Sequence, residues 1–170
     1  MNIFILDENP EIAARSLVQC HLAKMTTEGA QILATAFSTE ILSNPQCPKT
    51  KSGTSWKHSH FNHPCCKWCR ESRANMLWLI EHCFAADNER VERNNTPPSH
   101  VVNFLNWWLE NINQSIAPNI PLTKFALAMP DIYHRDNPVE AYRLYYKFGK
   151  KHLHSWKRNR PLWIDSENVI

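Results

Sequence analysis

Prolines that follow helix-capping side chains mark where helices begin in this sequence. An asparagine or threonine stands at or just before a proline in Asn9-Pro10, Asn62-His63-Pro64, Thr96-Pro97 and Asn137-Pro138. Such a side chain accepts hydrogen bonds from the free backbone N–H groups of a first helical turn, where proline is also tolerated because it lacks an N–H. The pattern therefore predicts helices over about residues 10–42, 64–94, 97–112 and 138–152.

These boundaries predict a mainly α-helical fold, a compact single-domain bundle of about four helices. Residues 2–6 are expected as a short extended N-terminus and residues 156–164 as an irregular C-terminal tail. The polar, proline-containing segments 43–62 and 113–137 are expected as loops, the second long enough to be functional. With 43% hydrophobic and 21% charged residues, the whole of 1–170 is expected to fold as one domain.

The composition narrows the functional classes. Only three glycines occur, and neither a GxGxxG nor a GxxxxGKS/T motif, which argues against nucleotide-cofactor chemistry. The chain has no run of 18 apolar residues, and its N-terminus lacks the flanks of a secretory signal, so we expect no membrane partner. The six cysteines lack the spacing of a disulfide framework, as in a reducing compartment. We therefore expect a cytoplasmic protein.

A candidate active site lies on the first predicted helix. His21, Lys24, Glu28 and Gln31 occur at offsets 0, 3, 7 and 10, which confines them to a helical strip about 80° wide. Because apolar residues border this strip, its acid, base and cation are expected to be partly desolvated and to shift one another's pKa, as in proton-transfer sites. The same strip equally suits a buried ion-pair network that holds two helices in register.

The next predicted helix repeats this spacing in His63, Cys66, Arg70 and Arg73. Two helices with one polar strip each can turn those strips toward a shared cleft. In that cleft His63 would be a catalytic hydrogen-bonding group, and Arg70 and Arg73 would bind phosphate or orient Glu28. The arginines could instead pair with nearby glutamates on the surface, where such pairs contribute little stability.

The C-terminal part of the chain is basic and aromatic. Residues 138–163 carry seven Lys or Arg and one Glu, a net charge of +6, while the remainder of the chain is −3. Aromatic residues interleave with these cations, as in proteins that bind phosphates and stack on bases, although a solvated basic helix has similar charges. We therefore predict DNA as the partner. The residues predicted to contact substrate or DNA are Gln31, Trp68, Arg70, Arg73, Tyr133, Arg143, Tyr146, Lys150, Trp156 and Arg158.

Histidines and cysteines are dense between residues 47 and 69. The candidate zinc ligands among them are His58, His60, Cys66 and Cys69. Structural zinc sites usually have two ligand pairs separated by about a dozen residues or more, and this region lacks that spacing. We therefore expect no metal and no cofactor, with zinc as the alternative.

Four stretches of the chain resemble a group of short phage-encoded proteins: MNIFILDENPEIAARSLVQCHLAKMTTEGAQIL, HFNHPCCKWCRES, PLTKFALAMPDIYHRDNPVEAYRLYY and RPLWI. The match spans nearly the whole chain. More distantly, the layout resembles the phage pyrimidine-dimer DNA glycosylase of the endonuclease V type. That enzyme is compact and mostly helical, with a histidine and a catalytic glutamate on its first long helix. Their spacing of seven residues is that of His21 and Glu28.

The resemblance implies a DNA-binding enzyme that acts on a flipped-out base by N-glycosidic chemistry, in the cytoplasm of an infected bacterial host. Glu28 would be the general acid/base or would stabilise a cationic intermediate, and His21 and Lys24 would tune it. The glycosylase family attacks the sugar with the α-amine that is exposed when the initiator methionine is removed. Here that amine would belong to Asn2, whose side chain is larger than methionine removal usually favours.

Two other functions fit the same residues. A transferase that installs a small group on a hydroxymethylated pyrimidine of phage DNA would use the same cleft with an added donor. A non-enzymatic module that binds DNA or a host protein would use both strips only as structural elements.

Overall fold

The computed structural model describes residues 1–166, and this part of the chain contains helices but no β-strand. Its α-helices are α1 (Pro10–Arg15), α2 (His21–Ala34), α3 (Thr39–Ser43), α4 (Pro64–Glu71), α5 (Arg73–Asn94), α6 (Val101–Asn111) and α7 (Pro138–Leu144). The shorter elements are the 3-10 turns η1 (Ile112–Gln114), η2 (Asp131–Tyr133), η4 (Lys151–Leu153) and η5 (Leu162–Ile164), and the π-helix η3 (Tyr145–Gly149). The mainly α-helical prediction is confirmed, but the described residues form seven α-helices rather than about four.

Side-chain caps confirm three of the four predicted helix starts. Asn9 Oδ1 accepts hydrogen bonds from two backbone N–H groups at the start of α1, and Asn137 Oδ1 does the same at the start of α7. His63, rather than Asn62, caps α4, because its Nδ1 accepts from the N–H of Cys65 at 3.2 Å. The prolines after these caps therefore mark real boundaries.

The start predicted at Thr96-Pro97 is wrong, since α6 begins at Val101. Arg90, near the end of α5, donates from Nη1 to Thr96 Oγ1 and from Nη2 to the carbonyl oxygen of Pro97, both at 2.7 Å. These bonds hold Thr96 and Pro97 in the turn between α5 and α6. The Thr96 hydroxyl therefore accepts a hydrogen bond from Arg90 and does not cap a helix.

The first predicted helix is divided into α1, α2 and α3. After α1, backbone carbonyls accept side-chain donors from distant parts of the chain. Arg93 of α5 donates to the carbonyl oxygens of Leu17 at 2.9 Å and Arg15 at 2.7 Å. Trp156 Nε1 donates to the carbonyl oxygen of Ser16 at 3.0 Å. Because both donors are remote in sequence, no local pattern predicts this break.

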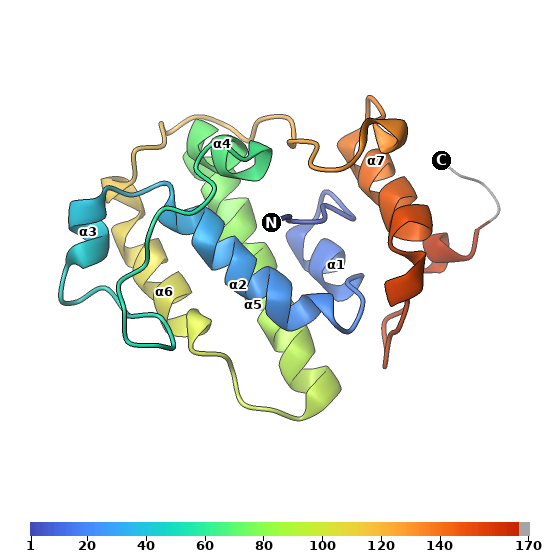
Figure 1. Cartoon of the computed structure of the whole chain (residues 1–170), viewed down its shortest axis with the longest axis horizontal. Coiled ribbons are helices and arrows are strands. Elements are labelled where there is room, and N and C mark those ends of the chain that lie inside the picture. Colours follow the sequence, from blue (N-terminus) through green and yellow to red (C-terminus); the bar gives the residue numbers. More distant parts are fainter. Residues whose placement is uncertain (167–170) are drawn as a thin grey trace.

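The second predicted helix is divided at Ser72, whose backbone is extended with φ −155° and ψ 145°. Ser72 Oγ donates to the carbonyl oxygen of Ile120 at 2.5 Å, and the N–H of Arg73 donates to that of Pro118 at 2.9 Å. The long segment between η1 and η2 crosses beside α4 in Figure 1 and is tied to the junction by these bonds. The expected loop is therefore present and contributes to the packing of α4 against α5.

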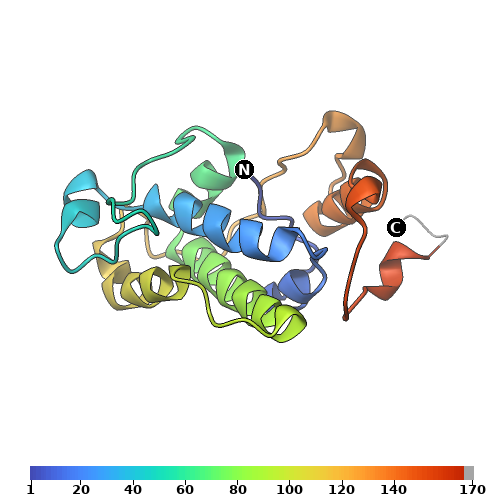
Figure 2. The ribbon, with the colours of Figure 1, turned by 60° about the horizontal axis from the view of Figure 1, so that its bottom comes forward.

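Helix α5 lies at the centre of the fold and packs against α1, α2, α4 and α6. Figure 2 shows α2 and α5 side by side, with α3 and α6 toward one end and α7 with the C-terminal segment toward the other. Residues 3–6 run into this core as an irregular segment and are all buried. On α5, Trp78 Nε1 donates to the carbonyl oxygen of Glu8 at 2.7 Å, and His82 Nε2 lies 3.1 Å from that of Ile3. Helix α5 thus fixes the N-terminal segment.

Gly29 sets the close approach of α2 to α5. A Cβ atom at this position would lie 2.2 Å from Sγ of the buried Cys83. We expect Gly29→Ala to lower the free energy of unfolding by about 1–3 kcal/mol, the usual cost of overpacking, in spite of alanine's better helix propensity. Chemical denaturation measures this loss. Adding Cys83→Ala should restore most of it, and a Gly29→Ala variant as stable as the parent would refute the close approach.

Candidate active site

The start of the chain meets Glu28 on α2. The backbone N–H of Asn2 donates to Glu28 Oε2 at 2.9 Å, and the α-amino nitrogen of Met1 lies 3.8 Å from the same oxygen. The Glu28 side chain is 17% exposed, so this contact is largely shielded from water. Figure 1 shows the N-terminus beside α2. A carboxylate and an amine therefore face each other at the edge of the core.

The Asn2 side chain locks the backbone in this position. Its Oδ1 accepts from the N–H of Phe4 at 2.9 Å, and its Nδ2 donates to the carbonyl oxygen of Ala128 at 2.7 Å. Phe4 adopts a left-handed backbone with φ 53°, which costs a bulky residue about 1–3 kcal/mol. The Phe4 ring stacks on His21, with centroids 4.6 Å apart and planes 11° from parallel. Packing thus stabilises a strained turn directly after the candidate reacting groups.

Lys24 and His63 complete the charged cluster. Lys24 Nζ lies 3.8 Å from Glu28 Oε1, and its side chain is 63% exposed. Because His63 Nδ1 accepts the capping hydrogen bond of α4, a neutral His63 carries its proton on Nε2. Burial lowers the pKa of His63, as do the amino terminus and His60, while the Glu28 carboxylate raises it. The imidazole therefore belongs to the same electrostatic environment as the amine and the carboxylate.

The side chain of Met1 lies inside the protein. It is 3% exposed, and the Cys66 thiol donates to Met1 Sδ at 3.5 Å. Burial raises the pKa of the Cys66 thiol, and it raises that of Cys69 well above its ordinary value. These cysteines are therefore protonated packing groups rather than nucleophiles.

His21 acts through Phe4 rather than on Glu28 directly. It is 4% exposed, and its Nδ1 lies 2.8 Å from the hydroxyl of Tyr146, which also accepts from the N–H of Val18. Burial, together with the positive charges of Lys150 and Lys24, lowers the pKa of His21 to about 4. A neutral His21 that accepts from Tyr146 is a positioning residue for the N-terminal turn.

The two arginines of the second strip are engaged by the protein. Arg70 Nη2 donates to the carbonyl oxygen of Phe61 at 2.8 Å, and its guanidinium lies 3.6 Å from the centroid of that ring. Arg73 Nη1 donates to Asn113 Oδ1 at 2.9 Å, and its Nε donates to the carbonyl oxygen of Ala117. Arg73 therefore fastens the loop after α6, and neither arginine pairs with Glu28. Gln31 is half-buried on the same strip of α2 as Glu28.

The aromatic contacts predicted for DNA lie mostly inside the fold. Trp68 is 1% exposed and Tyr146 is fully buried, so neither ring can stack on a base in this structure. Trp156 is half-buried and donates to the carbonyl oxygen of Ser16, directly after α1. Tyr133 is half-buried against Tyr145, with ring centroids 5.0 Å apart, and Lys150 Nζ lies 5.1 Å from the Tyr145 ring. Only Tyr133 and Lys150 of this group keep a partly exposed place near the N-terminal turn.

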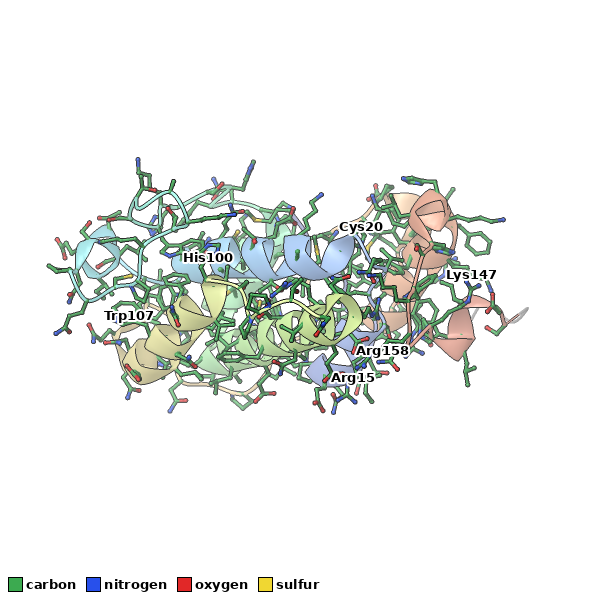
Figure 3. All side chains as sticks on the ribbon, turned by 90° about the horizontal axis from the view of Figure 1, so that it is seen from below. Arg15, Cys20, His100, Trp107, Lys147 and Arg158 are labelled. Atoms are coloured by element: carbon green, nitrogen blue, oxygen red, sulfur yellow. The ribbon has the colours of Figure 1, made fainter. Side chains whose placement is uncertain are left out.

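Two of the predicted DNA-binding arginines form ion pairs within the chain. Arg143 Nη2 donates to Asp7 Oδ2 at 2.9 Å. Arg158 pairs with Glu92 and with the buried Glu89, whose carboxylate also accepts from Arg93. Figure 3 shows Arg158 beside the end of α5. These contacts attach the C-terminal part of the chain to the helical core, and both guanidinium groups therefore already have carboxylate partners.

The candidate zinc ligands are not gathered into a site. His58 Nε2 bonds the carbonyl oxygen of Phe37 at 2.7 Å, while Cys66 contacts Met1 and Cys69 is enclosed by the core. His60 is exposed in the turn before α4. Within residues 1–166 no three His, Cys, Asp or Glu side chains are arranged to hold a metal ion.

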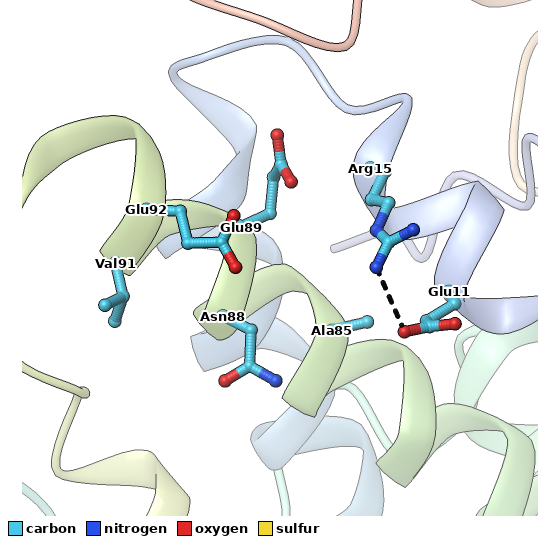
Figure 4. A pocket seen from close by; sticks show the side chains of 7 residues that line it. All are labelled: Glu11, Arg15, Ala85, Asn88, Glu89, Val91 and Glu92. Carbon is cyan, nitrogen blue, oxygen red and sulfur yellow. Dashed lines mark hydrogen bonds and ion pairs between the residues drawn. The ribbon is translucent and has the colours of Figure 1, made fainter.

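A separate concavity lies between α1 and α5. Figure 4 shows its lining of Glu11, Arg15, Ala85, Asn88, Glu89, Val91 and Glu92, around a volume of about 160 Å³. Its carboxylates already have partners, because Arg15 pairs with Glu11 at 3.3 Å and Arg93 pairs with Glu89 at 2.7 Å. Because these carboxylates are occupied by arginines, the amino terminus and Glu28 remain the better candidate site.

Sequence reasoning missed the residues that place the amine. Asn2 and Phe4 belong to no periodic strip, and their roles depend on Ala128 and His21, which are remote in sequence. The continuous apolar run over residues 3–6 was the available signal, since such a run indicates a segment buried on all sides.

Comparisons with known proteins give no relative, since no family model matches the chain and no curated protein or solved structure matches it significantly. No helix within residues 1–166 is long and apolar enough to cross a membrane.

The low pKa of His21 predicts acid sensitivity. The pKa is about 4 in the folded chain and 6.5 ordinarily, so the folded state favours the neutral imidazole. Its contribution to stability is complete above the ordinary pKa and is lost as pH falls toward 4, with a loss of about 2 kcal/mol between about pH 7 and pH 5. Denaturation at both pH values measures it. His21→Gln should reduce the dependence by about this amount and leave the share of the buried His82, whose pKa burial lowers to about 3. Substitution of the exposed His100 should not reduce it, and equal slopes in all three proteins would contradict the assignment.

Proposed function

We propose that this protein is a DNA-acting enzyme that breaks the N-glycosidic bond of a flipped-out base, with the α-amine at the start of the chain and Glu28 as the reacting pair. One observation carries the proposal: the amine of Met1 and the N–H of Asn2 lie 3.8 Å and 2.9 Å from Glu28 Oε2. If Met1 is removed, the nitrogen of Asn2, which lies 2.9 Å from the same oxygen, becomes the α-amine. The resemblance to the endonuclease V type of glycosylase supports the same pair.

The geometry suits covalent catalysis by an amine. In general α-amines are weaker bases than lysine ε-amines, so a larger fraction is uncharged and nucleophilic near neutral pH. The amine would attack C1′ of the sugar as the bond from C1′ to the base breaks, and the electron pair would leave with the base, which gains a proton. Glu28 would then take a proton from the attached nitrogen and give it to O4′ as the C1′–O4′ bond opens. An iminium results, which water hydrolyses.

The neighbouring groups support this chemistry electrostatically. The Glu28 carboxylate stabilises positive charge that develops at the sugar and the nitrogen, and it does so in a place largely shielded from water. Lys24 is exposed at the rim, where it can meet a phosphate. A neutral His63 has its proton on Nε2, and this N–H can donate a hydrogen bond to the leaving base. The proposed partner is DNA, and the predicted contacts Lys150 and Tyr133 are partly exposed near the N-terminal turn.

Reductive trapping tests the amine. With borohydride present, the iminium should be reduced to a stable bond between protein and a base-damaged oligonucleotide, and peptide mass spectrometry should place it on the first residue. One residue added before Met1 moves the amine by about 3.5 Å and should abolish trapping while the fold is kept. A crosslink on Lys24 or no crosslink would refute the amine. A base that changes mass without leaving the strand would favour the transferase, and DNA binding without chemistry would favour the non-enzymatic module.

Glu28→Gln tests the carboxylate. It keeps the shape and an acceptor for the N–H of Asn2, but it removes the charge and the proton transfer. We expect turnover to fall about 100- to 10,000-fold with DNA affinity nearly unchanged. Single-turnover base release and a binding titration measure the two effects.

The exposed Glu110 on α6 offers a matched control, since Glu110→Gln removes the same charge away from the site. A structural role for Glu28 predicts a different result: the stability of Glu28→Gln would fall by about 3 kcal/mol or more, because a buried partner charge loses its compensation. A strongly lowered melting temperature would therefore contradict the catalytic assignment.

A further inference from the structure

A pocket at the C-terminal end of the fold contains cations that the candidate active site does not use. Its volume is about 290 Å³, and its lining includes Lys147, Phe148, Lys151, His154, Arg160 and Asp165. The π-helix η3, the turn η4 and the tail that leads to η5 supply these side chains. Figure 3 shows Lys147 at this end of the molecule.

The charged side chains that line this pocket give it a net positive charge, because Lys147, Lys151 and Arg160 share the carboxylate of Asp165. Arg160 is neutralised, because its Nε donates to Asp165 Oδ2 at 3.0 Å, and this contact lowers the pKa of Asp165. Lys147 Nζ donates to the backbone carbonyl of Ser166, which is uncharged, and Lys151 is exposed. The pair of Arg160 and Asp165 therefore forms a fixed wall, and Lys147 and Lys151 make the pocket positive.

An exposed aromatic ring stands beside these lysines. Phe148 is 51% exposed, and Lys147 Nζ lies 5.8 Å from the centroid of its ring. Exposure of a large apolar ring to water is unfavourable. Exposed aromatic rings beside cations are the surfaces on which proteins usually stack unpaired bases. The ring and the two lysines thus offer a stacking surface next to an anion site.

The pocket is held in place by the core. His154 Nε2 donates to the carbonyl oxygen of Tyr146 at 2.9 Å, and Tyr146 is fully buried. The wide π-turn ends at Gly149, where a Cβ would lie 2.6 Å from the Tyr145 ring. Such π-turns are rare and often occur at functional sites. The same turn that packs Tyr145 toward Phe4 therefore also carries Lys147 and Phe148 to the pocket.

We propose that this pocket binds one unpaired nucleotide of DNA, with its phosphate between Lys147 and Lys151 and its base stacked on Phe148. The proposal rests on the proposed function for the identity of the polymer. Duplex DNA hides the faces of its bases, whereas an enzyme that extrudes a base creates unpaired nucleotides. Free phosphate would satisfy the lysines and leave Phe148 without a partner.

Binding of a fluorescein-labelled thymidine homo-oligonucleotide, measured by anisotropy over a range of salt concentrations, separates the two contacts. Lys147→Ala with Lys151→Ala should reduce the slope of log affinity against log salt by about 0.7 for each lost phosphate contact. Phe148→Ala should weaken binding about 5- to 150-fold and leave the slope unchanged, because stacking releases no counterions. Inorganic phosphate should compete poorly.

Lys49→Ala with Lys51→Ala is the matched control, since both lysines are exposed on the loop after α3. Equal slopes in both double variants, tight competition by phosphate, or an unchanged affinity in Phe148→Ala would each overturn the proposal. Thermal melts identify a misfolded variant, and Lys147→Gln with Lys151→Gln then provides the same test. Failed trapping at the amine with the expected slopes would refute the proposed function and leave this pocket in place.

Discussion

The burial of the N-terminal segment is the constraint on which the candidate site depends. Residues 3–6 are enclosed between α2, α5 and α7, so the backbone that precedes them has little freedom. The Asn2 side chain accepts a hydrogen bond from the backbone N–H of Phe4, which has no partner in a helix or strand. His82 Nε2 lies within hydrogen-bond distance of the carbonyl oxygen of Ile3. A chain terminus usually frays, because nothing offsets its conformational entropy. Here hydrophobic burial on all sides supplies that offset, and the amine is held against Glu28 as a result.

Glu28 is placed by a rigid element, which matters for the chemistry it could perform. It projects from α2, and α2 is pressed against α5 where Gly29 meets Cys83. A carboxylate on a packed helix and an amine on a buried segment need little reorganisation when charge develops between them. The strained φ of Phe4 has the same consequence, since the turn persists only because the His21 and tyrosine rings fix it.

Arginines hold the fold together, and lysines stay on its surface. Arg93 ends α1, Arg73 fastens the long loop, and Arg158 attaches the C-terminal segment to Glu89. Their planar, forked donors suit carbonyls and carboxylates at fixed positions, whereas a lysine ammonium is strongly hydrated and less easily buried. The charge of +6 over residues 138–163 therefore overstates what a polyanion can reach. Near the two candidate sites, the cations of that segment that remain at least partly exposed are the lysines at 147, 150 and 151 and the paired Arg160.

Sequence alone determined the helical class, three helix starts and the strip that carries Lys24 and Glu28, because capping and helical period are local properties. It could not determine where the long helices break, since Arg93 and Trp156 come from distant segments to bind the carbonyls after α1. Nor could it separate the structural role of Trp68 from a binding role, because burial is a property of the assembled core. The contact between the amino terminus and Glu28 is likewise a feature that the sequence alone could not determine. It exists only because two segments 26 residues apart are packed together, and the tertiary structure decided it.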